Sequence, residues 1–310
     1  MTTASDAPGT RRGRWWKLTW IIPAALVFAF LVVLAAKGIR GLPDVQSFMT
    51  DYPGRSALPA DAPVGFPAWL NWQHFLNSLF ILFILRTGWE LHTAKRPSVF
   101  WTRNNTGLIR TKNPPVRIGL PLWFHLTVSS LWVLNGVILY ILLFSSGQWM
   151  RVIPTSWDVI PNALSAGLQY ASLDWPMDNG WVNYNALQLL AYFATTFVAA
   201  PLALATGIRL SPGFAASFRS IDRLVPLKAT RTVHFAVMIY FVGFIIVHVT
   251  LVLATGALRN LNHMYATRDD EGWLGFAFFA ASIVIMIVGW MLARPSLLAP
   301  VAALTGKLRR

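Results

Sequence analysis

The sequence predicts an all-α integral membrane protein built from six transmembrane helices. Hydrophobic residues make up 55% of the 310 residues, charged residues make up only 12%, and the mean hydropathy is +0.51. This composition is far from that of a soluble globular domain. Six apolar stretches are each long enough to cross a hydrocarbon core of about 30 Å. They span residues 18–36, 69–89, 120–144, 185–207, 232–256 and 273–293.

The first apolar stretch resembles a secretion signal in one respect, because basic residues precede it. Those residues are Arg11, Arg12, Arg14 and Lys17. The stretch is followed by Lys37, Gly38 and Arg40 instead of a cleavage site made of small residues. We therefore expect a retained membrane helix.

A formal net charge of +14 would indicate nucleic-acid binding in a soluble protein, but here the charges alternate along the chain. The two termini and the connections 86–119 and 208–231 hold 20 of the 26 lysines and arginines, whereas the alternate connections hold nine of the twelve acidic residues. Because basic residues concentrate in cytoplasmic connections, we expect both termini in the cytoplasm and the chain in the cell's inner membrane. The lipid bilayer is an expected partner, and nucleic acid is not.

The chain contains no cysteine, which excludes disulfides, thiolate-ligated iron–sulfur clusters, covalently attached haem and a cysteine nucleophile. It also lacks a glycine-rich phosphate loop and an HExxH zinc motif. Any redox centre in this chain must therefore be non-covalent, with histidine or methionine ligands.

The fifth stretch carries two histidines, His234 and His248, fourteen residues apart. On an α-helix this spacing returns both side chains to within about 40° of one face and separates them by roughly 21 Å along the axis. Ionisable side chains at membrane depth are costly and usually functional, and imidazole is a common axial ligand of haem iron. The spacing predicts two ligand sites, one in each leaflet.

Two histidines in other stretches supply a partner for each site. With cytoplasmic termini, the second stretch enters from outside and places His74 in the outer leaflet. The third stretch enters from the cytoplasm and places His125 in the inner leaflet, and the fifth places His234 there as well. The predicted ligand pairs are therefore His125 with His234 for an inner haem, and His74 with His248 for an outer haem.

Small residues are expected where a haem passes a helix that does not ligate it. Gly136 and Gly88 lie on the histidine-bearing faces of the third and second stretches, at the levels of the outer and the inner haem respectively. Arg231, just before His234, is a candidate partner for a haem propionate. Close helix packing explains the glycines equally well, and the positive-inside rule explains the arginine equally well.

Two further histidines are not assigned as ligands. His92 lies roughly 27 Å along the helix axis from His74, which is too far for the second site, so it is expected at the membrane interface. His263 is expected in a surface loop after the fifth stretch rather than in contact with quinone.

Three segments around the ligand histidines resemble one family. They are Trp72-Gln73-His74-Phe75, Trp123-Phe124-His125, and Arg231-Thr232-Val233-His234 through Val247-His248-Val249. The family is that of the dihaem cytochrome b subunits of bacterial formate dehydrogenases and nickel–iron hydrogenases, grouped with bacterial cytochrome b561. The resemblance covers about residues 69–265, four of the six helices.

The resemblance implies two non-covalent b haems with bis-histidine ligation in a four-helix bundle made of helices two to five. The expected division is a cytoplasmic tail, extra helix and outer loop over 1–68, the dihaem cytochrome b domain over 69–265, and a last helix and cytoplasmic tail over 266–310. The four-helix relatives begin their first ligand helix in the cytoplasm. The added N-terminal helix therefore inverts the core here.

The resemblance also implies electron transfer between a peripheral redox subunit and membrane quinone. We expect an electron-transfer subunit of a respiratory oxidoreductase complex rather than its catalytic subunit. A cytoplasmic redox enzyme of molybdopterin or iron–sulfur type is expected to dock on the connections 86–119 and 208–231. Quinone is expected beside the outer haem, near Asn71, Gln73 and Asn77.

The predicted quinone site would be completed by the outer connection 145–184, which is rich in tryptophan.

Two other functions fit the same residues. One is a self-contained superoxide:quinone oxidoreductase of the cytochrome b561 type, which needs no partner subunit. The other is a transporter in which the histidines relay protons or bind a transition metal.

Overall fold

The structure is a computed structural model that describes most of the chain. The described residues are 12–93, 97–106, 110, 114–177, 179–214, 218 and 224–309. Arg11 and parts of both predicted docking connections, 86–119 and 208–231, lie outside the described residues.

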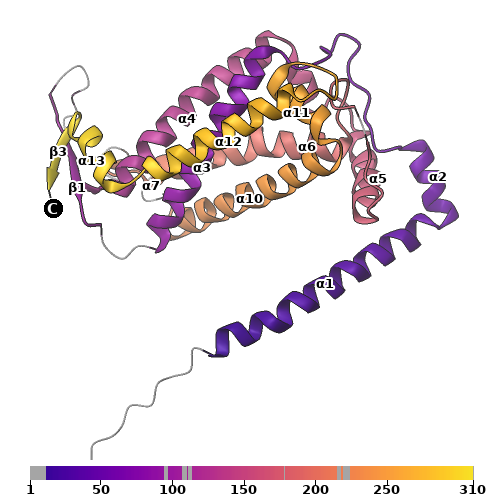
Figure 1. Cartoon of the computed structure of the whole chain (residues 1–310), viewed down its shortest axis with the longest axis horizontal. Helices are drawn as coiled ribbons and strands as arrows, with labels where there is room; N and C mark the ends of the chain where they lie inside the picture. Colours follow the sequence, from indigo (N-terminus) through magenta and orange to yellow (C-terminus); the bar gives the residue numbers. More distant parts are fainter. Residues whose placement is uncertain are drawn as a thin grey trace, which may run out of the picture. The chain divides into compact units, whose positions relative to one another are not determined.

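Six helices of the described chain are long and apolar enough to cross a membrane (Figure 1). They are α1 (Arg12–Arg40), α3 (Ala68–Thr93), α4 (Leu120–Ser145), the composite of α6 (Ala186–Phe193), η2 (Ala194–Ala199) and α7 (Ala200–Leu210), α10 (Leu227–Ala254), and α12 (Leu274–Leu292). The prediction of an all-α membrane protein with six spans is confirmed, and each predicted stretch lies within or close to one of these helices.

The fourth span contains a π-helical segment, η2, between its two α-helical parts. Pro201 follows this segment at the start of α7, and because proline has no N–H, regular α-helical pairing is interrupted there. The Tyr140 hydroxyl donates to the Thr196 carbonyl at 2.6 Å. A side chain of a neighbouring helix thus satisfies a backbone group inside the irregular segment.

Several short elements were not predicted. They are α2 (Pro43–Asp51), η1 (Gln148–Arg151), α5 (Val159–Ala171), α11 (Ala257–Ala266), α13 (Pro295–Ala303) and the strands β1 (Phe100–Arg103), β2 (Ile118–Gly119) and β3 (Gly306–Arg309). Part of the outer loop expected between the first two apolar stretches is therefore helical, over α2. The first helical residue of α2 is proline, which suits the start of a helix because its missing N–H needs no partner there.

The strands form one small antiparallel sheet in the order β2-β1-β3. It joins the connection between α3 and α4 to the C-terminal segment. The Trp101 indole N–H donates to the Ala302 carbonyl at 2.9 Å, and Ala302 is buried in a cluster with Leu120 and Trp123. The connection before α4 and the C-terminal segment therefore lie at the same end of the helices, as alternating spans require.

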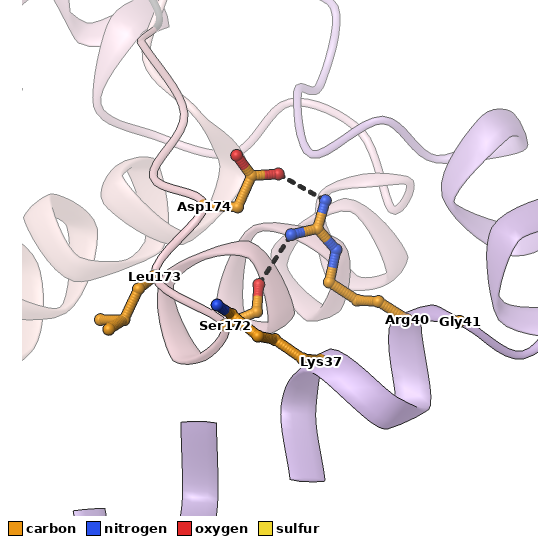
Figure 2. Close-up of a pocket in the computed structure, with 6 residues that line it drawn as sticks. All are labelled: Lys37, Arg40, Gly41, Ser172, Leu173 and Asp174. Atoms are coloured by element: carbon orange, nitrogen blue, oxygen red, sulfur yellow. Dashed lines mark hydrogen bonds and ion pairs between the residues drawn. The ribbon is translucent and has the colours of Figure 1, made fainter. Parts of the chain in front are cut away.

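The chain divides into two compact units. The first comprises Met1–Ser56, Ser156–Pro176 and Asn185–Leu187, and the second comprises the remaining residues. In the first unit, the Arg40 guanidinium at the end of α1 donates to the Ser172 hydroxyl at 2.7 Å and to the Asp174 carboxylate at 2.6 Å (Figure 2). These residues border a surface cavity of about 480 Å³. The predicted divisions after residues 68 and 265 stay predictions.

The second unit contains all of the predicted ligand histidines. Within it α3 packs on α4, and α7 packs on α10. Phe83 of α3 and Val128 of α4 are buried in one apolar cluster, and Val237 and Phe241 of α10 are buried with Ala199 in another. These two helix pairs position the candidate site.

Candidate functional site

The structure brings the four membrane histidines together as two pairs. The ring centroids of His74 on α3 and His248 on α10 are 6.3 Å apart, with an angle of 54° between the ring planes. Those of His125 on α4 and His234 on α10 are 6.5 Å apart, with an angle of 75°. These are the two pairs that the depth argument predicts, and α10 contributes one histidine to each.

The ring separations suit a metal ion held between the two imidazoles of each pair. A metal bonded to one nitrogen of each ring at about 2 Å, in a line, would hold the ring centroids roughly 6.3 Å apart. A direct hydrogen bond between the rings would draw the centroids to roughly 5 Å. The observed separations match the first arrangement. The residues present therefore fit bis-histidine ligation of haem iron.

The pair His125–His234, predicted for the inner leaflet and called the inner pair below, contacts two threonines. The Nδ1 atom of His125 lies 2.8 Å from the hydroxyl of Thr87 on α3, and the Nδ1 atom of His234 lies 2.8 Å from the hydroxyl of Thr206 on α7. Each threonine lies on the helix that packs against the histidine's own helix. Each ligand histidine of this pair thus has one ring nitrogen engaged by protein and one left for a ligand.

The pair His74–His248, predicted for the outer leaflet and called the outer pair below, has a different environment. The Nδ1 atom of His74 is buried and has no hydrogen-bond partner among the described residues, while the ring meets that of Tyr265 edge-on at 5.7 Å. His248 stacks on Phe244 with centroids 5.5 Å apart and an angle of 5°, and its ring is 5.9 Å from that of Tyr192. Aromatic rings rather than hydroxyl groups surround the outer imidazoles.

The two predicted glycines lie beside the pairs in different ways. A Cβ atom added at Gly88 would lie 3.8 Å from Cε1 of His125 and 3.4 Å from Sδ of Met238. At Gly136 an added Cβ would have no described atom within 4 Å. Gly88 thus borders the inner pair, as expected, and the space beside Gly136 is open. That either glycine makes room for a haem stays a prediction.

Arg231 is exposed at the start of α10, one turn before His234. Its predicted contact with a haem propionate therefore stays a prediction. His92 is exposed in the last turn of α3 and stacks on Phe235 with ring centroids 4.3 Å apart.

Sequence reasoning missed six residues that lie against the histidine pairs. They are Thr87, Thr206, Gly207, Tyr192, Phe244 and Tyr265. One signal for three of them was present, because the dipeptide Thr-Gly occurs at 87–88 and again at 206–207, in two different membrane spans. For Tyr265 the sequence holds no comparable signal, because its position depends on the short helix α11.

The residues proposed for quinone lie along the first turns of α3. The Gln73 side chain is only 7% exposed, and its Oε1 atom has no hydrogen-bond partner among the described residues. Asn71 donates to the Thr267 hydroxyl at 2.7 Å. Asn77 accepts a hydrogen bond from the Trp132 indole at 2.6 Å. Asn71 and Gln73 are therefore the residues of this group with an unused buried acceptor, Oδ1 and Oε1 respectively.

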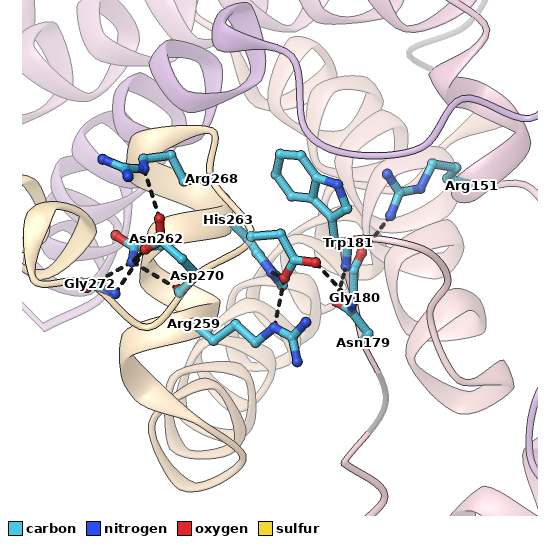
Figure 3. Close-up of polar contacts among 11 residues, drawn as sticks. Arg151, Asn179, Gly180, Trp181, Arg259, Asn262, His263, Arg268, Asp270 and Gly272 are labelled. Atoms are coloured by element: carbon cyan, nitrogen blue, oxygen red, sulfur yellow. Dashed lines mark hydrogen bonds and ion pairs between the residues drawn. The ribbon is translucent and has the colours of Figure 1, made fainter.

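His263 is not in a surface loop, so this expectation is wrong. It lies on α11 and is 3% exposed, stacked on Phe66 with ring centroids 5.7 Å apart. Its Nε2 atom lies 2.7 Å from the Asp269 carboxylate, which also accepts from Arg259 at 2.7 Å (Figure 3). Helix α11 packs against α12, α10 and α3, and the rings of Phe66 and Trp181 lie against His263 and cover it.

Burial holds the pKa of His263 below its ordinary value, against the opposing effect of the Asp269 carboxylate. The Arg259 guanidinium holds the pKa of the Asp269 carboxyl well below its usual range. The folded protein thus resists protonation at both groups. At mildly acidic pH the histidine is the group that matters, because the carboxyl titrates only at much lower pH.

We expect the free energy of unfolding to fall as the pH drops below the ordinary histidine pKa of about 6.5. Between the lowered pKa and about pH 6.5, the unfolded chain takes up a proton at His263 and the folded chain does not. The stabilisation is therefore complete above about pH 6.5 and is lost as the pH falls from there to the lowered pKa. Thermal unfolding in detergent at about pH 7.5 and about pH 5.5 measures the effect. A His263→Gln variant should lose less stability between these two pH values than the native chain. An unchanged pH dependence in His263→Gln would contradict the expectation.

The chain is similar to one curated protein, the "Putative protein-methionine-sulfoxide reductase subunit YedZ1" of Azospira oryzae. The two are 28% identical over 192 residues, which cover 60% of this chain and 88% of that protein. No protein-family model matches the chain, and no solved structure matches it. The likeness supports the resemblance in its broad form, a membrane b-type cytochrome, and does not single out the formate dehydrogenase or hydrogenase subunits.

Proposed function

We propose that this chain is a dihaem b-type cytochrome subunit that passes electrons between a redox partner and membrane quinone. The observation that carries the proposal is the presence of two histidine pairs in one helix bundle, each with a ring separation suited to a metal ion. The two histidines of α10 are fourteen residues apart, roughly 21 Å along a helix. The two centres would therefore lie at different depths in the membrane.

His125 and His234 would hold the inner haem, and His74 and His248 the outer one. Each haem, when bound, supplies reversible one-electron chemistry at its iron. The chain itself provides the axial ligands, orients their rings through its helices and surrounds them with apolar side chains. Val237 and Phe241, both buried between the two histidine levels on α10, belong to this apolar surrounding.

A partner subunit is supported by the relative's name, which describes one subunit of a reductase. This chain has no cysteine for an iron–sulfur cluster, so an iron–sulfur cluster would have to come from another chain. We place the partner on the cytoplasmic side, on the basic connections 86–119 and 208–231. Its identity as a molybdopterin or iron–sulfur enzyme is part of the proposal.

Quinone is proposed to bind beside the outer pair. The support comes from three buried polar atoms without a hydrogen-bond partner among the described residues, Oδ1 of Asn71, Oε1 of Gln73 and Nδ1 of His74. Buried polar groups in native proteins normally have partners, and a quinone offers carbonyl acceptors in its oxidised form and hydroxyl donors in its reduced form. The aromatic ring of Tyr265, which meets that of His74 edge-on, would form an apolar wall.

The test is the spectrum and haem content of the purified chain. We expect a red protein with about two haems per chain and b-type bands in the reduced-minus-oxidised spectrum, reducible by a quinol. A colourless protein that is inserted in the membrane and folded would refute the cytochrome proposal. A quinone analogue that perturbs only the His125–His234 centre would refute the proposed location of quinone.

A further inference from the structure

We propose that Thr87 and Thr206 are positioning residues that fix the tautomer of the two inner histidines and thereby set the redox potential of the inner centre. The inference rests on the proposed function, because it concerns how this chain prepares its ligands for iron. It adds two residues on helices that contribute no ligand to that centre.

The hydroxyl of Thr87 has one proton to donate, and its partner is a backbone carbonyl. Its Oγ1 atom lies 2.7 Å from the Phe83 carbonyl oxygen, one turn earlier on α3. This bond is the usual one for a threonine inside a helix. With its proton directed to the backbone, the hydroxyl can only accept from the ring nitrogen of His125, which lies 2.8 Å away. His125 therefore carries its proton on Nδ1.

Thr206 repeats the arrangement on another helix. Its Oγ1 atom lies 2.6 Å from the Leu202 carbonyl oxygen, again one turn earlier. The same hydroxyl lies 2.8 Å from Nδ1 of His234, so it too must accept from that nitrogen. In a neutral imidazole with a protonated Nδ1, Nε2 is the nitrogen with a free lone pair. Both inner histidines are thus prepared to bind iron through Nε2.

The residue after each threonine is glycine, and this leaves room for the histidine ring. An added Cβ at Gly207 would lie 3.5 Å from Cε1 of His234, and one at Gly88 would lie 3.8 Å from Cε1 of His125. Even the smallest side chain would therefore touch the ring. The Thr-Gly pair presents a hydrogen-bond acceptor and an open backbone surface to the same imidazole.

Burial protects the contacts of Thr87 and Thr206 with the two histidines from water. Thr87 is 2% exposed and Thr206 is 9% exposed, so water does not readily replace either hydroxyl. The outer pair provides the contrast within the same chain. Nδ1 of His74 has no partner among the described residues, and His248 is surrounded by the rings of Phe244 and Tyr192. Removing the threonine hydroxyls should therefore affect the inner centre alone.

The expected electronic effect has a defined sign. A histidine that donates its Nδ1–H to an acceptor becomes a more basic ligand, and a more basic ligand stabilises the ferric over the ferrous state. Removal of the acceptor should therefore shift the midpoint potential of the inner centre in the positive direction. It should also free the ring to rotate, because the hydroxyl no longer fixes its plane.

The experiment compares Thr87→Val, Thr206→Val and the double variant with Thr87→Ser and Thr206→Ser. Valine keeps the shape and removes the acceptor, whereas serine keeps a hydroxyl that can make both bonds. Purified protein is titrated potentiometrically and its oxidised form is examined by low-temperature electron paramagnetic resonance. Ligand variants His234→Ala and His248→Ala assign each midpoint and each ferric signal to the inner or the outer centre.

We expect each valine variant to shift the inner midpoint positively and to change the inner ferric signal, with a larger shift in the double variant. The serine variants should restore the native values. The outer centre, read in the same sample, should stay unchanged and reports that the protein is folded. Valine variants with two haems and an unchanged inner midpoint and ferric signal would overturn the inference, and so would an equal shift at both centres. A native chain without haem would instead overturn the proposed function.

Discussion

Replacing His248 by alanine should halve the haem content of the purified chain. His248 faces His74 with ring centroids 6.3 Å apart, and iron bound to His74 alone would lose one of its two axial bonds. His125 and His234 form a separate pair, so the inner haem should remain. The reciprocal variant His234→Ala should keep the outer haem and lose the inner one. The haem-to-protein ratio and the number of redox waves in a potentiometric titration measure both results.

The matched control is His92→Ala, which removes a histidine of α3 that is exposed and pairs with no other histidine. It should keep both haems. His263→Ala should also keep both, because His263 bonds to Asp269 rather than facing a ligand histidine. Retention of both haems in His248→Ala would contradict the assignment of that residue as a ligand. Loss of both haems from a folded His248→Ala protein would contradict the division into two independent pairs.

Replacing Gly275 by valine should destabilise the protein by roughly 3 kcal/mol or more, because the change forces side-chain atoms into a packed backbone contact. Gly275 begins the first turn of α12, where its N–H donates to the Asn262 side chain at 2.6 Å. A Cβ atom at this position would overlap backbone atoms of Leu261 and Asn262. Asn262 is completely buried, so neither helix can yield without losing its hydrogen bonds.

The effect should reach the outer centre, because α11 carries both Asn262 and Tyr265, and the Tyr265 ring contacts that of His74. We expect the apparent melting temperature to fall by on the order of 5 °C, together with a changed spectrum of the outer haem. Gly243→Val is the control, since Gly243 is exposed in the middle of α10 and an added Cβ would have no described atom within 4 Å. Equal melting temperatures for the two variants would contradict the packing argument.

Much of the helical architecture could be predicted from the sequence because the membrane imposes a local requirement. Every backbone group within the hydrocarbon must be satisfied inside its own segment, so a long apolar stretch forms a helix whatever its neighbours are. The spans that contain His74, His125 and His234 all follow this rule. The histidine pairs were predictable for a related reason, since depth along a helix depends only on residue number and direction.

The short elements and the polar contacts were not predictable in this way. His263 is buried against Phe66 and Trp181, which come from distant parts of the chain, and the sheet between β1 and β3 joins segments about two hundred residues apart in sequence. Local propensity carries no information about such pairings. A polar segment such as Asn260 to His263 therefore has the composition of a surface loop although it is largely buried.

The sequence by itself determined that this chain spans a membrane with six helices and that its histidines lie at two depths. Both results follow from the hydrophobic length of each segment and from the regular rise of an α-helix. Only the tertiary structure decided which groups meet those histidines: the hydroxyls of Thr87 and Thr206 at the inner pair, and the rings of Tyr265, Phe244 and Tyr192 at the outer pair. The physical reason is that most of these neighbours belong to other helices, and the rotation of one helix against another is set by packing across the whole bundle rather than by any single segment.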